Sequence, residues 1–277
     1  MRLAYQVITP EVSLHPDLTC YSGDLGYIFS RLSTFGYDGV ELMTTDPDAF
    51  SWTDIQTRLA AYGLSPVLVC TGELGGLGYN VSDPDDAQRE ESLRRIFRII
   101  DFAACLGVPI NAGRIKGEYK SNVPQEVTWR HAVEGFRRIC DYAKPKGVSV
   151  ALETAAYVFM NFINTCAQAE RLIEEVDRPN FGLMMDLFHM HVEEPNLVDS
   201  IHQYAKHLLH VHLADNNRMY PGASGLDFMA ILRAFREVGY DGAFTVETRQ
   251  LPDSERCAQS AAGHLLPILR AVYGSAV

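Results

Sequence analysis

No segment of this sequence approaches the run of about 18 apolar residues that a membrane-spanning helix requires. The first ten residues, MRLAYQVITP, also lack the basic stretch and apolar run of a secretory signal. Six cysteines are scattered along the chain with no Cys-x-x-Cys pair, so we expect reduced, mostly buried thiols rather than a disulfide framework. These absences predict a soluble, cytoplasmic protein.

Basic residues are outnumbered: 24 Lys and Arg stand against 35 Asp and Glu, which gives a formal net charge of −11. This charge repels the phosphate backbone of nucleic acids and anionic membranes unless a basic patch is locally concentrated, and the sequence shows no such patch. We therefore expect neither nucleic acid nor a membrane as a partner. The 277 residues, 47% of them hydrophobic and 21% charged, suffice for a folded enzyme with a large core.

Glycine-rich phosphate loops are also absent. Neither G-x-G-x-x-G nor G-x-x-x-x-G-K-[S/T] occurs, which argues against a doubly wound nucleotide-binding sheet. The glycine-containing segment 71–79 (TGELGGLGY) lacks the Lys-Ser/Thr ending of such a loop. We interpret it as a mobile loop over a pocket or, with equal weight, as a plain surface loop.

Short apolar runs alternate along the chain with longer segments of helical periodicity. The runs of strand length are Leu3–Ile8, Gly39–Met43, Ser65–Cys70, Pro109–Ala112, Val148–Glu153, Phe181–Asp186, Leu208–Leu213 and Ala243–Glu247. The amphipathic segments between them include Asp24–Phe35, Glu90–Leu106, His131–Lys144, Asn164–Val176 and Leu226–Val238. Eight strand–helix units without a linker-like segment predict an α/β fold, a (β/α)8 TIM barrel that forms a single domain over residues 1–277.

Ligand-type side chains stand at the ends of the last four strands: Glu153, Asp186, His212 and Glu247. They are separated by 33, 26 and 35 residues, about one strand–helix unit each, so in a barrel they would converge at one mouth. Three carboxylates buried together require a compensating cation. We therefore predict one divalent metal ion, Mn²⁺ with Mg²⁺ or Co²⁺ as alternatives and Zn²⁺ less suited. Taken singly, each residue could instead cap a helix or form a salt bridge.

Further polar residues lie near this predicted mouth. His189 follows Asp186 by three residues and could reach a substrate hydroxyl. His210 lies on the same strand face as His212 but one layer deeper, which indicates either a histidine that supports the metal ligands from behind or a core histidine. Arg218 stands in an Asn-rich loop and could bind a hydroxyl or carboxylate of a substrate, or be an ordinary exposed arginine.

Two cations follow the fourth predicted strand. Arg114 and Lys116 could hold an anionic group near the mouth, and exposed surface charge is the equally weighted alternative. His191 is expected to be solvated in the loop beyond His189. The other histidines show no pattern and are interpreted as structural or surface residues: His15, His131, His202, His207 and His264.

Five sequence blocks, taken together in order and spacing, resemble a known group of proteins. They are GYDGVEL (36–42), FINT (162–165), MDLFHMHVEE (185–194), HVHLADNNRMYPG (210–222) and GYDGAFTVE (239–247). The chain resembles, over nearly its whole length, the sugar isomerase/epimerase superfamily of xylose-isomerase-like barrels, and within it the ketose 3-epimerases of the tagatose/psicose and keto-gluconate type.

The resemblance implies roles for six residues. It implies that Glu153, Asp186, His212 and Glu247 hold the divalent metal, with Glu153 and Glu247 also acting as the acid/base pair. His189 and Arg218 match positions that touch substrate oxygens in such enzymes. The resemblance also implies a homodimer or homotetramer.

One segment departs from the pattern of these epimerases. After the fifth-strand glutamate they typically read Pro, a variable residue, Asn, Arg, an aromatic residue and Glu, whereas Glu153 is followed by Thr-Ala-Ala-Tyr-Val-Phe. Tyr157 thus replaces the arginine, and Phe159 replaces the glutamate that in such enzymes binds the carbonyl end of the ketose. We expect a more apolar wall and an altered substrate contact there.

The function that these observations favour is a metal-dependent epimerase of a ketose or keto sugar acid. Proton abstraction next to a carbonyl would give an enediolate, and return of the proton to the opposite face would invert that carbon. Aldose–ketose isomerisation and dehydration of a keto sugar remain open on the same metal site, as does a non-catalytic sugar-binding protein. Endonucleases acting at abasic DNA share the fold, but they need a larger His-rich zinc cluster and a basic face, and neither is evident.

Overall fold

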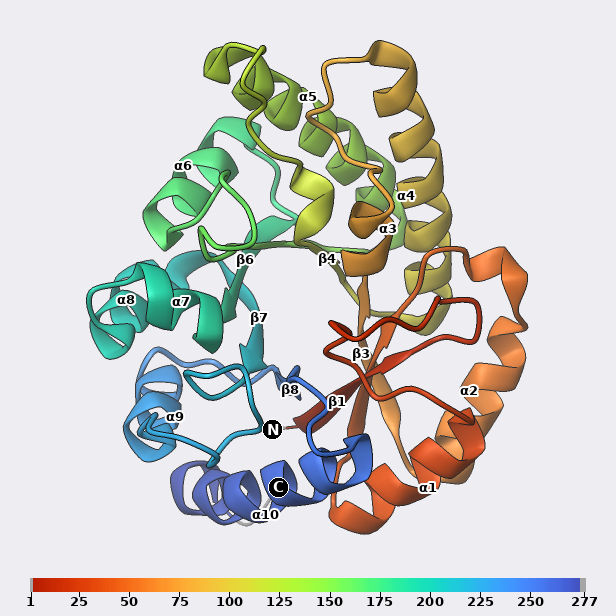
Figure 1. The fold of residues 1–277 in the computed structure, drawn as a ribbon, viewed down its shortest axis with the longest axis vertical. Helices are drawn as coiled ribbons and strands as arrows, with labels where there is room; N and C mark the ends of the chain where they lie inside the picture. Colours follow the sequence, from red (N-terminus) through yellow and green to blue (C-terminus); the bar gives the residue numbers. More distant parts are fainter. Residues whose placement is uncertain (1, 275–277) are drawn as a thin grey trace.

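The computed structural model describes residues 2–274, and within this range eight parallel strands close into a barrel. The strands are β1 (Arg2–Ile8), β2 (Gly39–Met43), β3 (Ser65–Cys70), β4 (Ile110–Ala112), β5 (Val150–Glu153), β6 (Phe181–Asp186), β7 (Leu208–Leu213) and β8 (Ala243–Val246). Each strand pairs with the next along the chain, and β8 pairs with β1 (Figure 1). The predicted barrel is confirmed, with strand ends that differ by at most two residues.

Helices surround the barrel (Figure 1). The longer ones are α1 (Leu25–Phe35), α2 (Trp52–Ala61), α4 (Asp86–Leu106), α5 (Gln125–Ala143), α6 (Cys166–Val176), α8 (Leu197–Tyr204), α9 (Phe228–Glu237) and α10 (Ser254–Tyr273). Shorter elements are α3 (Gly72–Gly76), α7 (Leu187–Glu193), η1 (Pro47–Ala49), η2 (Arg114–Lys116), η3 (Lys144–Lys146) and η4 (Ala205–His207). Gly107 ends α4 in the left-handed region, at φ 69°, where its N–H bonds to the carbonyl of Ala103.

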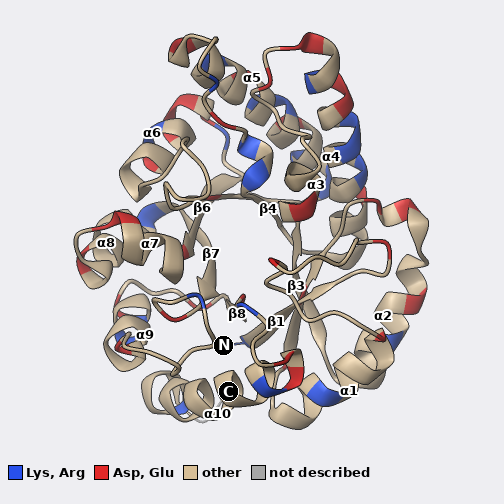
Figure 2. Ribbon diagram, in the orientation of Figure 1, with Lys and Arg blue, Asp and Glu red and all other residues tan. Residues whose placement is uncertain are grey.

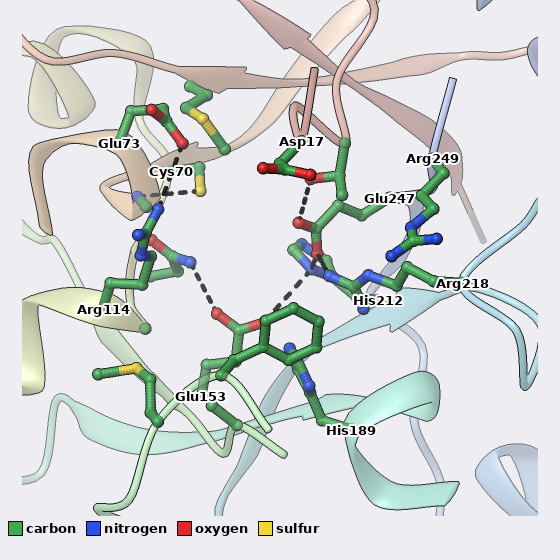
Figure 3. A pocket seen from close by; sticks show the side chains of 18 of the residues that line it. Asp17, Cys70, Glu73, Arg114, Glu153, His189, His212, Arg218, Glu247 and Arg249 are labelled. Atoms are coloured by element: carbon green, nitrogen blue, oxygen red, sulfur yellow. Dashed lines mark hydrogen bonds and ion pairs between the residues drawn. The ribbon is translucent and has the colours of Figure 1, made fainter. Parts of the chain in front are cut away.

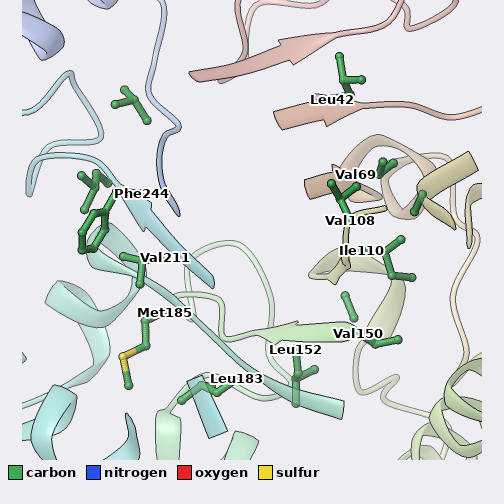
Figure 4. Packing of buried hydrophobic residues seen from close by; sticks show 14 of the residues in the cluster. Leu42, Val69, Val108, Ile110, Val150, Leu152, Leu183, Met185, Val211 and Phe244 are labelled. Carbon is green, nitrogen blue, oxygen red and sulfur yellow. The ribbon is translucent and has the colours of Figure 1, made fainter. Parts of the chain in front are cut away.

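The main hydrophobic core lies between the strands and the surrounding helices. Because strand side chains alternate in direction, one residue in two along each strand faces the helices. Figure 4 shows this outward-facing set, with Leu42, Val69, Leu152 and Val211 among its buried members. A separate, smaller cluster fills the barrel interior and includes Ala4, Met43, Leu68, Ala151 and Met184. Stability therefore rests mainly on the outer layer, which leaves the inner face of the strands available for polar residues.

The segment 71–79 is not a plain loop, which corrects the expectation from its glycines. It contains α3, which begins directly after β3 and packs on η2. A Cβ at Gly75 would lie 2.5 Å from the Cβ of Arg114 and 2.8 Å from the backbone nitrogen of Ile115. The glycine therefore permits close packing of two backbones.

The charged side chains lie largely on the outer helices, where blue and red segments alternate (Figure 2). The arginines of α4 are paired with acidic neighbours: Arg95 bonds to Glu91, and Arg98 to Asp46 and Asp48. Within residues 2–274, no helix combines the length and the apolar character needed to cross a membrane. In the same range the six cysteines are free thiols, all buried as expected apart from Cys105, which is exposed.

Glycine packing in the barrel gives a test of the fold. A Cβ at Gly182 in β6 would lie 2.4 Å from the carbonyl oxygen of His207, so Gly182→Ala should lower the free energy of unfolding by about 1–3 kcal/mol. The control is Gly263→Ala in α10, where nothing lies within 4 Å and the change should stabilise by up to about 1 kcal/mol. Urea denaturation followed by circular dichroism measures both. Equal stability of the two variants would contradict the packing described here.

Candidate metal centre

A cavity of about 330 Å³ opens at the carboxyl ends of the strands, the end of a TIM barrel where binding groups gather. Its lining includes Glu153, His212 and Glu247 together with His189 and Arg218. Figure 3 shows Glu153 and Glu247 on opposite sides, with His212 between them. Five of the six sequence-predicted site residues thus line one cavity, and the sixth, Asp186, lies beside them in the cluster with Glu153, His212 and Glu247.

The four predicted metal ligands converge. One donor atom from each of Glu153, Asp186, His212 and Glu247 lies within 4.8 Å of the other three, and all four residues are buried. The Nδ1 atom of His212 is 2.7 Å from Oε2 of Glu247, 3.7 Å from Oδ2 of Asp186 and 3.8 Å from Oε1 of Glu153. Three carboxylate oxygens and one imidazole nitrogen form a donor set that fits a hard divalent cation.

Charge compensation within this cluster is uneven. Arg218 donates from Nη1 to Asp186 at 2.7 Å, and its Nη2 lies 2.8 Å from Oε2 of Glu247. Burial raises the pKa of Glu153 to about 8, a rise that His212 opposes and that the charges of Glu247 and Asp186 reinforce. One carboxyl of the cluster therefore stays protonated near neutral pH when only protein groups surround it. A cation at this position would supply the missing positive charge.

Asp186 serves two structural purposes through its two oxygens. Oδ1 caps α7 by accepting hydrogen bonds from the backbone of Phe188 at 2.8 Å and His189 at 3.0 Å. Oδ2 faces the cluster and Arg218. Helix capping and a possible ligand role, which the sequence left as alternatives, are therefore compatible.

Glu41, in the middle of β2, contacts the cluster, and the sequence analysis did not single it out. Its Oε2 lies 2.8 Å from Nε2 of His212 and 3.0 Å from Nε2 of His210, and its Oε1 accepts from Gln6 at 2.7 Å. Burial alone would raise its pKa, but the two histidines, His212 above all, lower it well below its usual range. The ionised Glu41 therefore accepts a hydrogen bond from the Nε2–H of His212, which leaves Nδ1 as the atom that faces the carboxylates.

A signal for Glu41 was present in the sequence. An acidic residue flanked by Val40 and Leu42 inside an apolar strand needs a buried partner. His210 is buried, and its Nε2 also lies 3.0 Å from Oγ1 of Thr245. Its contact with Glu41 makes the two interpretations from the sequence, a core histidine and a support for the metal ligands, compatible.

The end of β4 shapes the surroundings of Glu153. Asn111 donates from Nδ2 to Oε2 of Glu153 at 3.2 Å, and its Oδ1 accepts from the backbone of Thr71 at 2.7 Å. A Cβ at Gly113 would lie 2.4 Å from the same carboxylate oxygen. Gly113 therefore leaves the space that the Glu153 side chain occupies, and Asn111 orients it.

Lys116 is fully buried, so its interpretation as an exposed surface charge is wrong. Its Nζ donates to the carbonyl of Gly113 at 3.1 Å and lies 3.5 Å from the sulfur of Met160. Burial lowers the pKa of Lys116 to about 8, although Glu153 opposes this change. Arg114, by contrast, is exposed and lines the cavity, and its Nη1 lies 3.5 Å from Oε1 of Glu73.

His189 stands in the first turn of α7 and faces the cavity as a neutral hydrogen-bond donor. Its Nδ1 accepts the backbone N–H of Ala156 at 3.1 Å, which leaves the proton on Nε2. Burial lowers the pKa of His189 to about 4, so the ring is uncharged at neutral pH. His191 is exposed, as expected, but it lies in α7 rather than in a loop.

Arg218 is buried, so the alternative of an ordinary exposed arginine is wrong. Its backbone adopts a left-handed φ of 63°, and its guanidinium lies 5.0 Å from the ring centroid of Phe188. The Asp215 carboxylate holds the loop by accepting backbone N–H groups of Gly222 and Leu226. The strained loop is therefore built to place this guanidinium beside the carboxylates.

The loop after β1 adds two residues that the sequence did not single out as site residues. Thr19 donates from Oγ1 to Oε1 of Glu247 at 2.6 Å. His15 is exposed, as a surface histidine should be, yet it lines the cavity rim and lies 3.0 Å from Glu73. Both come from a part of the chain more than 220 residues before Glu247, so sequence spacing gave no indication of them.

Comparisons with known proteins agree with the barrel fold. The family described as xylose isomerase-like TIM barrel matches residues 29–267. A ketose 3-epimerase of Arthrobacter globiformis is 29% identical over 225 residues, which cover 80% of this chain and 76% of that protein. A 3-dehydro-D-guloside 4-epimerase of Escherichia coli is 28% identical over 234 residues, 80% of this chain and 86% of that protein.

A solved structure of an L-ribulose 3-epimerase superposes with a TM-score of 0.82 at 20% identity and covers 98% of this chain and 95% of that one. At this identity the likeness shows the fold alone. The named relatives are sugar epimerases, and an isomerase or epimerase enzyme is therefore supported.

Glu41→Gln tests the orientation of His212. The amide removes the charged acceptor of the Nε2 proton, so the affinity for Mn²⁺ should fall about 10- to 100-fold, measured by isothermal titration calorimetry. The control is Glu73→Gln, which alters a carboxylate of the cavity outside the cluster and should leave the affinity nearly unchanged. Wild-type affinity in the Glu41 variant would contradict the proposed orientation.

Metal affinity is expected to rise with pH. Glu153 has a pKa of about 8, and Glu41 and Glu247 raise the pKa of His212 well above its usual range despite its burial. Both residues then carry protons that a metal must displace, so the apparent association constant should increase at least about tenfold per pH unit between about pH 6 and 8. Calorimetry in buffers of different ionisation enthalpy counts the released protons. An affinity independent of pH would exclude this protonation pattern.

Proposed function

The chain belongs to the family of xylose isomerase-like TIM barrels, and we propose that it is a divalent-metal-dependent epimerase that inverts a carbon next to the carbonyl of a keto sugar. The observation that carries the proposal is the pair of glutamates, Glu153 and Glu247, which face one cavity from strands three positions apart in the barrel. Relatives named as ketose 3-epimerase and 3-dehydro-D-guloside 4-epimerase support it.

The metal would be held by four residues, Glu153, Asp186, His212 and Glu247, whose donor set suits Mn²⁺, Mg²⁺ or Co²⁺, and we propose Mn²⁺. When bound, such a cation stabilises the negative charge that develops on a carbonyl oxygen as the neighbouring carbon loses its proton. Asn111 and Thr19 keep the two glutamates in place through hydrogen bonds of 3.2 and 2.6 Å.

The surroundings of the two glutamates shift their pKa values in opposite directions, as an acid/base pair requires. Burial acts to raise both pKa values, but Arg218 and His212 lower that of Glu247, whereas that of Glu153 is raised to about 8. Glu247 would remove the proton from the carbon. Glu153, the more easily protonated of the two, would take up a proton from solvent and deliver it to the opposite face. The carbon is inverted, no electrons are gained or lost, and both carboxyls exchange their protons with solvent between turnovers.

Two residues would orient the substrate. The Nε2–H of His189 can donate to a substrate oxygen without bringing a charge. Arg218 lines the cavity and already bridges Asp186 and Glu247, so it can contact a hydroxyl while it keeps those carboxylates apart. Isomerisation would need the proton to return to the neighbouring carbon, and dehydration would need a leaving hydroxyl. The paired glutamates favour epimerisation over both.

Deuterium exchange tests the proposed function. Metal-loaded protein in D2O should place deuterium on the carbon next to the carbonyl of a keto sugar, detected by NMR, and a chelator should stop the exchange. Glu153→Gln and Glu247→Gln should each reduce kcat by about 10²- to 10⁴-fold, because each removes one partner of the proton transfer.

Metal content must be measured in both variants, since each residue is also a proposed ligand. Glu73→Gln, outside the cluster, serves as the matched control and should retain exchange. Exchange that persists in either site variant would remove that residue from the acid/base role, and exchange in the presence of chelator would contradict metal dependence.

A further inference from the structure

Phe159 is a large apolar side chain left open to the cavity of the metal centre. Its side chain remains 57% exposed, and it lines the same cavity as Glu153 and His189. Tyr157, two residues earlier, is 68% exposed but is not among the residues that line this cavity. A phenyl ring cannot form a hydrogen bond with a hydroxyl or a carboxylate of a substrate. Its presence beside a polar cluster therefore favours a substrate that has an apolar face as well as polar groups.

The segment that carries Phe159 is fastened in place by its backbone. Phe159 donates its N–H to the carbonyl of Ala156 at 2.9 Å. The side chain of Asn164 donates to the carbonyls of Ala155 at 2.6 Å and Met160 at 2.7 Å, which closes the turn. Ile163 adopts a left-handed φ of 55°, a strained conformation for a β-branched residue that persists only where its surroundings hold it. The ring is therefore carried by an ordered support.

Aromatic neighbours back the ring from one side. The centroid of Phe159 lies 5.7 Å from that of His189 and 6.0 Å from that of Phe188, both in edge-to-face geometry. His189 is the residue whose Nε2–H points to the cavity, so the aromatic surface and the proposed substrate donor are joined. A group resting on Phe159 would therefore lie within reach of His189.

A sugar ring has the complementary shape. Its axial C–H groups form an apolar face that stacks on an aromatic ring, while its hydroxyls point outward from the ring edge toward polar partners. An open-chain ketose has no such face. A ketose that closes its own ring does so by converting its carbonyl into a hemiketal, and this removes the carbonyl that the chemistry requires.

From this geometry we infer that Phe159 is a specificity-determining platform for a ring-closed keto sugar, a glycoside whose ketone is on a ring carbon other than the anomeric one. Such a molecule can stack and react at the same time. The inference rests on the proposed epimerase function and narrows its substrate class. Glu247 takes the proton from the ring carbon next to the ketone and Glu153 returns one from the other face, so the product is the epimeric keto-glycoside.

The test compares two substrates in D2O with the metal-loaded protein: methyl 3-keto-glucopyranoside, which is locked as a ring, and D-fructose, which reacts as an open chain. The wild-type protein should exchange the glycoside with a kcat/KM at least about tenfold above that for fructose. Phe159→Ala should raise KM for the glycoside about three- to tenfold with little change in kcat, the size expected of one stacking contact. For fructose, the kcat/KM of the Phe159→Ala variant should stay within about twofold of the wild-type value.

Two control variants separate stacking from other effects. Phe159→Trp keeps an aromatic face and should retain the glycoside preference, and Tyr157→Ala removes an exposed neighbour outside the cavity lining and should change neither substrate. Sedimentation of each variant checks assembly. An altered oligomeric state in both Phe159→Ala and Tyr157→Ala would identify this surface as a subunit interface and overturn the inference, as would equal losses on both substrates or a preference for fructose.

A binding measurement distinguishes failure of this inference from failure of the proposed function. The tryptophan of the Phe159→Trp variant reports stacking by fluorescence, without catalysis. Quenching by methyl glucopyranoside but not by the open-chain polyol glucitol supports the platform even if no substrate exchanges deuterium, a result that would refute only the epimerase proposal. Equal responses to both compounds would overturn the platform.

Discussion

Mutual repulsion of buried carboxylates is the constraint that organises this protein. A parallel barrel directs the ends of all its strands to one mouth, and here Glu153, Asp186 and Glu247 stand at the ends of β5, β6 and β8. Such a cluster is stable only with positive charge among the carboxylates. Arg218 and His212 supply part of it, and the raised pKa of Glu153 marks the part that they do not supply. A site in which the negative charge of the carboxylates exceeds the positive charge of the protein groups is suited to a divalent cation.

In this barrel, stability and chemistry depend on different faces of the strands. Apolar side chains on the outer face of the strands pack against the helices and form the main core (Figure 4). The inner face is thereby free to hold a buried polar layer below the mouth, in which Gln6, Glu41, His210 and Thr245 bond to one another. This layer is fully enclosed, so it can fix the orientation of His212 without exposure to water.

The cavity has two unlike walls, and they have different roles. One wall carries the carboxylates and His212, the groups that any proton transfer next to a carbonyl would use. The other is formed by Phe159, in the segment after β5, and by His189, in α7, whose rings lie edge to face. Because Phe159 is carried by a loop and the carboxylates by strand ends, a change in that loop can alter the cavity without moving the carboxylates.

The sequence by itself determined the barrel and the four converging residues. Apolar runs of strand length repeat along the chain, and in a parallel barrel the carboxyl ends of all strands lie at the same mouth. Only the tertiary structure decided that Lys116 is buried, that Arg218 bridges two carboxylates, and that Glu41 bonds to His212 from 171 residues away. The reason is physical: periodicity reports whether a residue faces the core, whereas its partner, its charge state and its exposure depend on segments that meet only when the barrel closes.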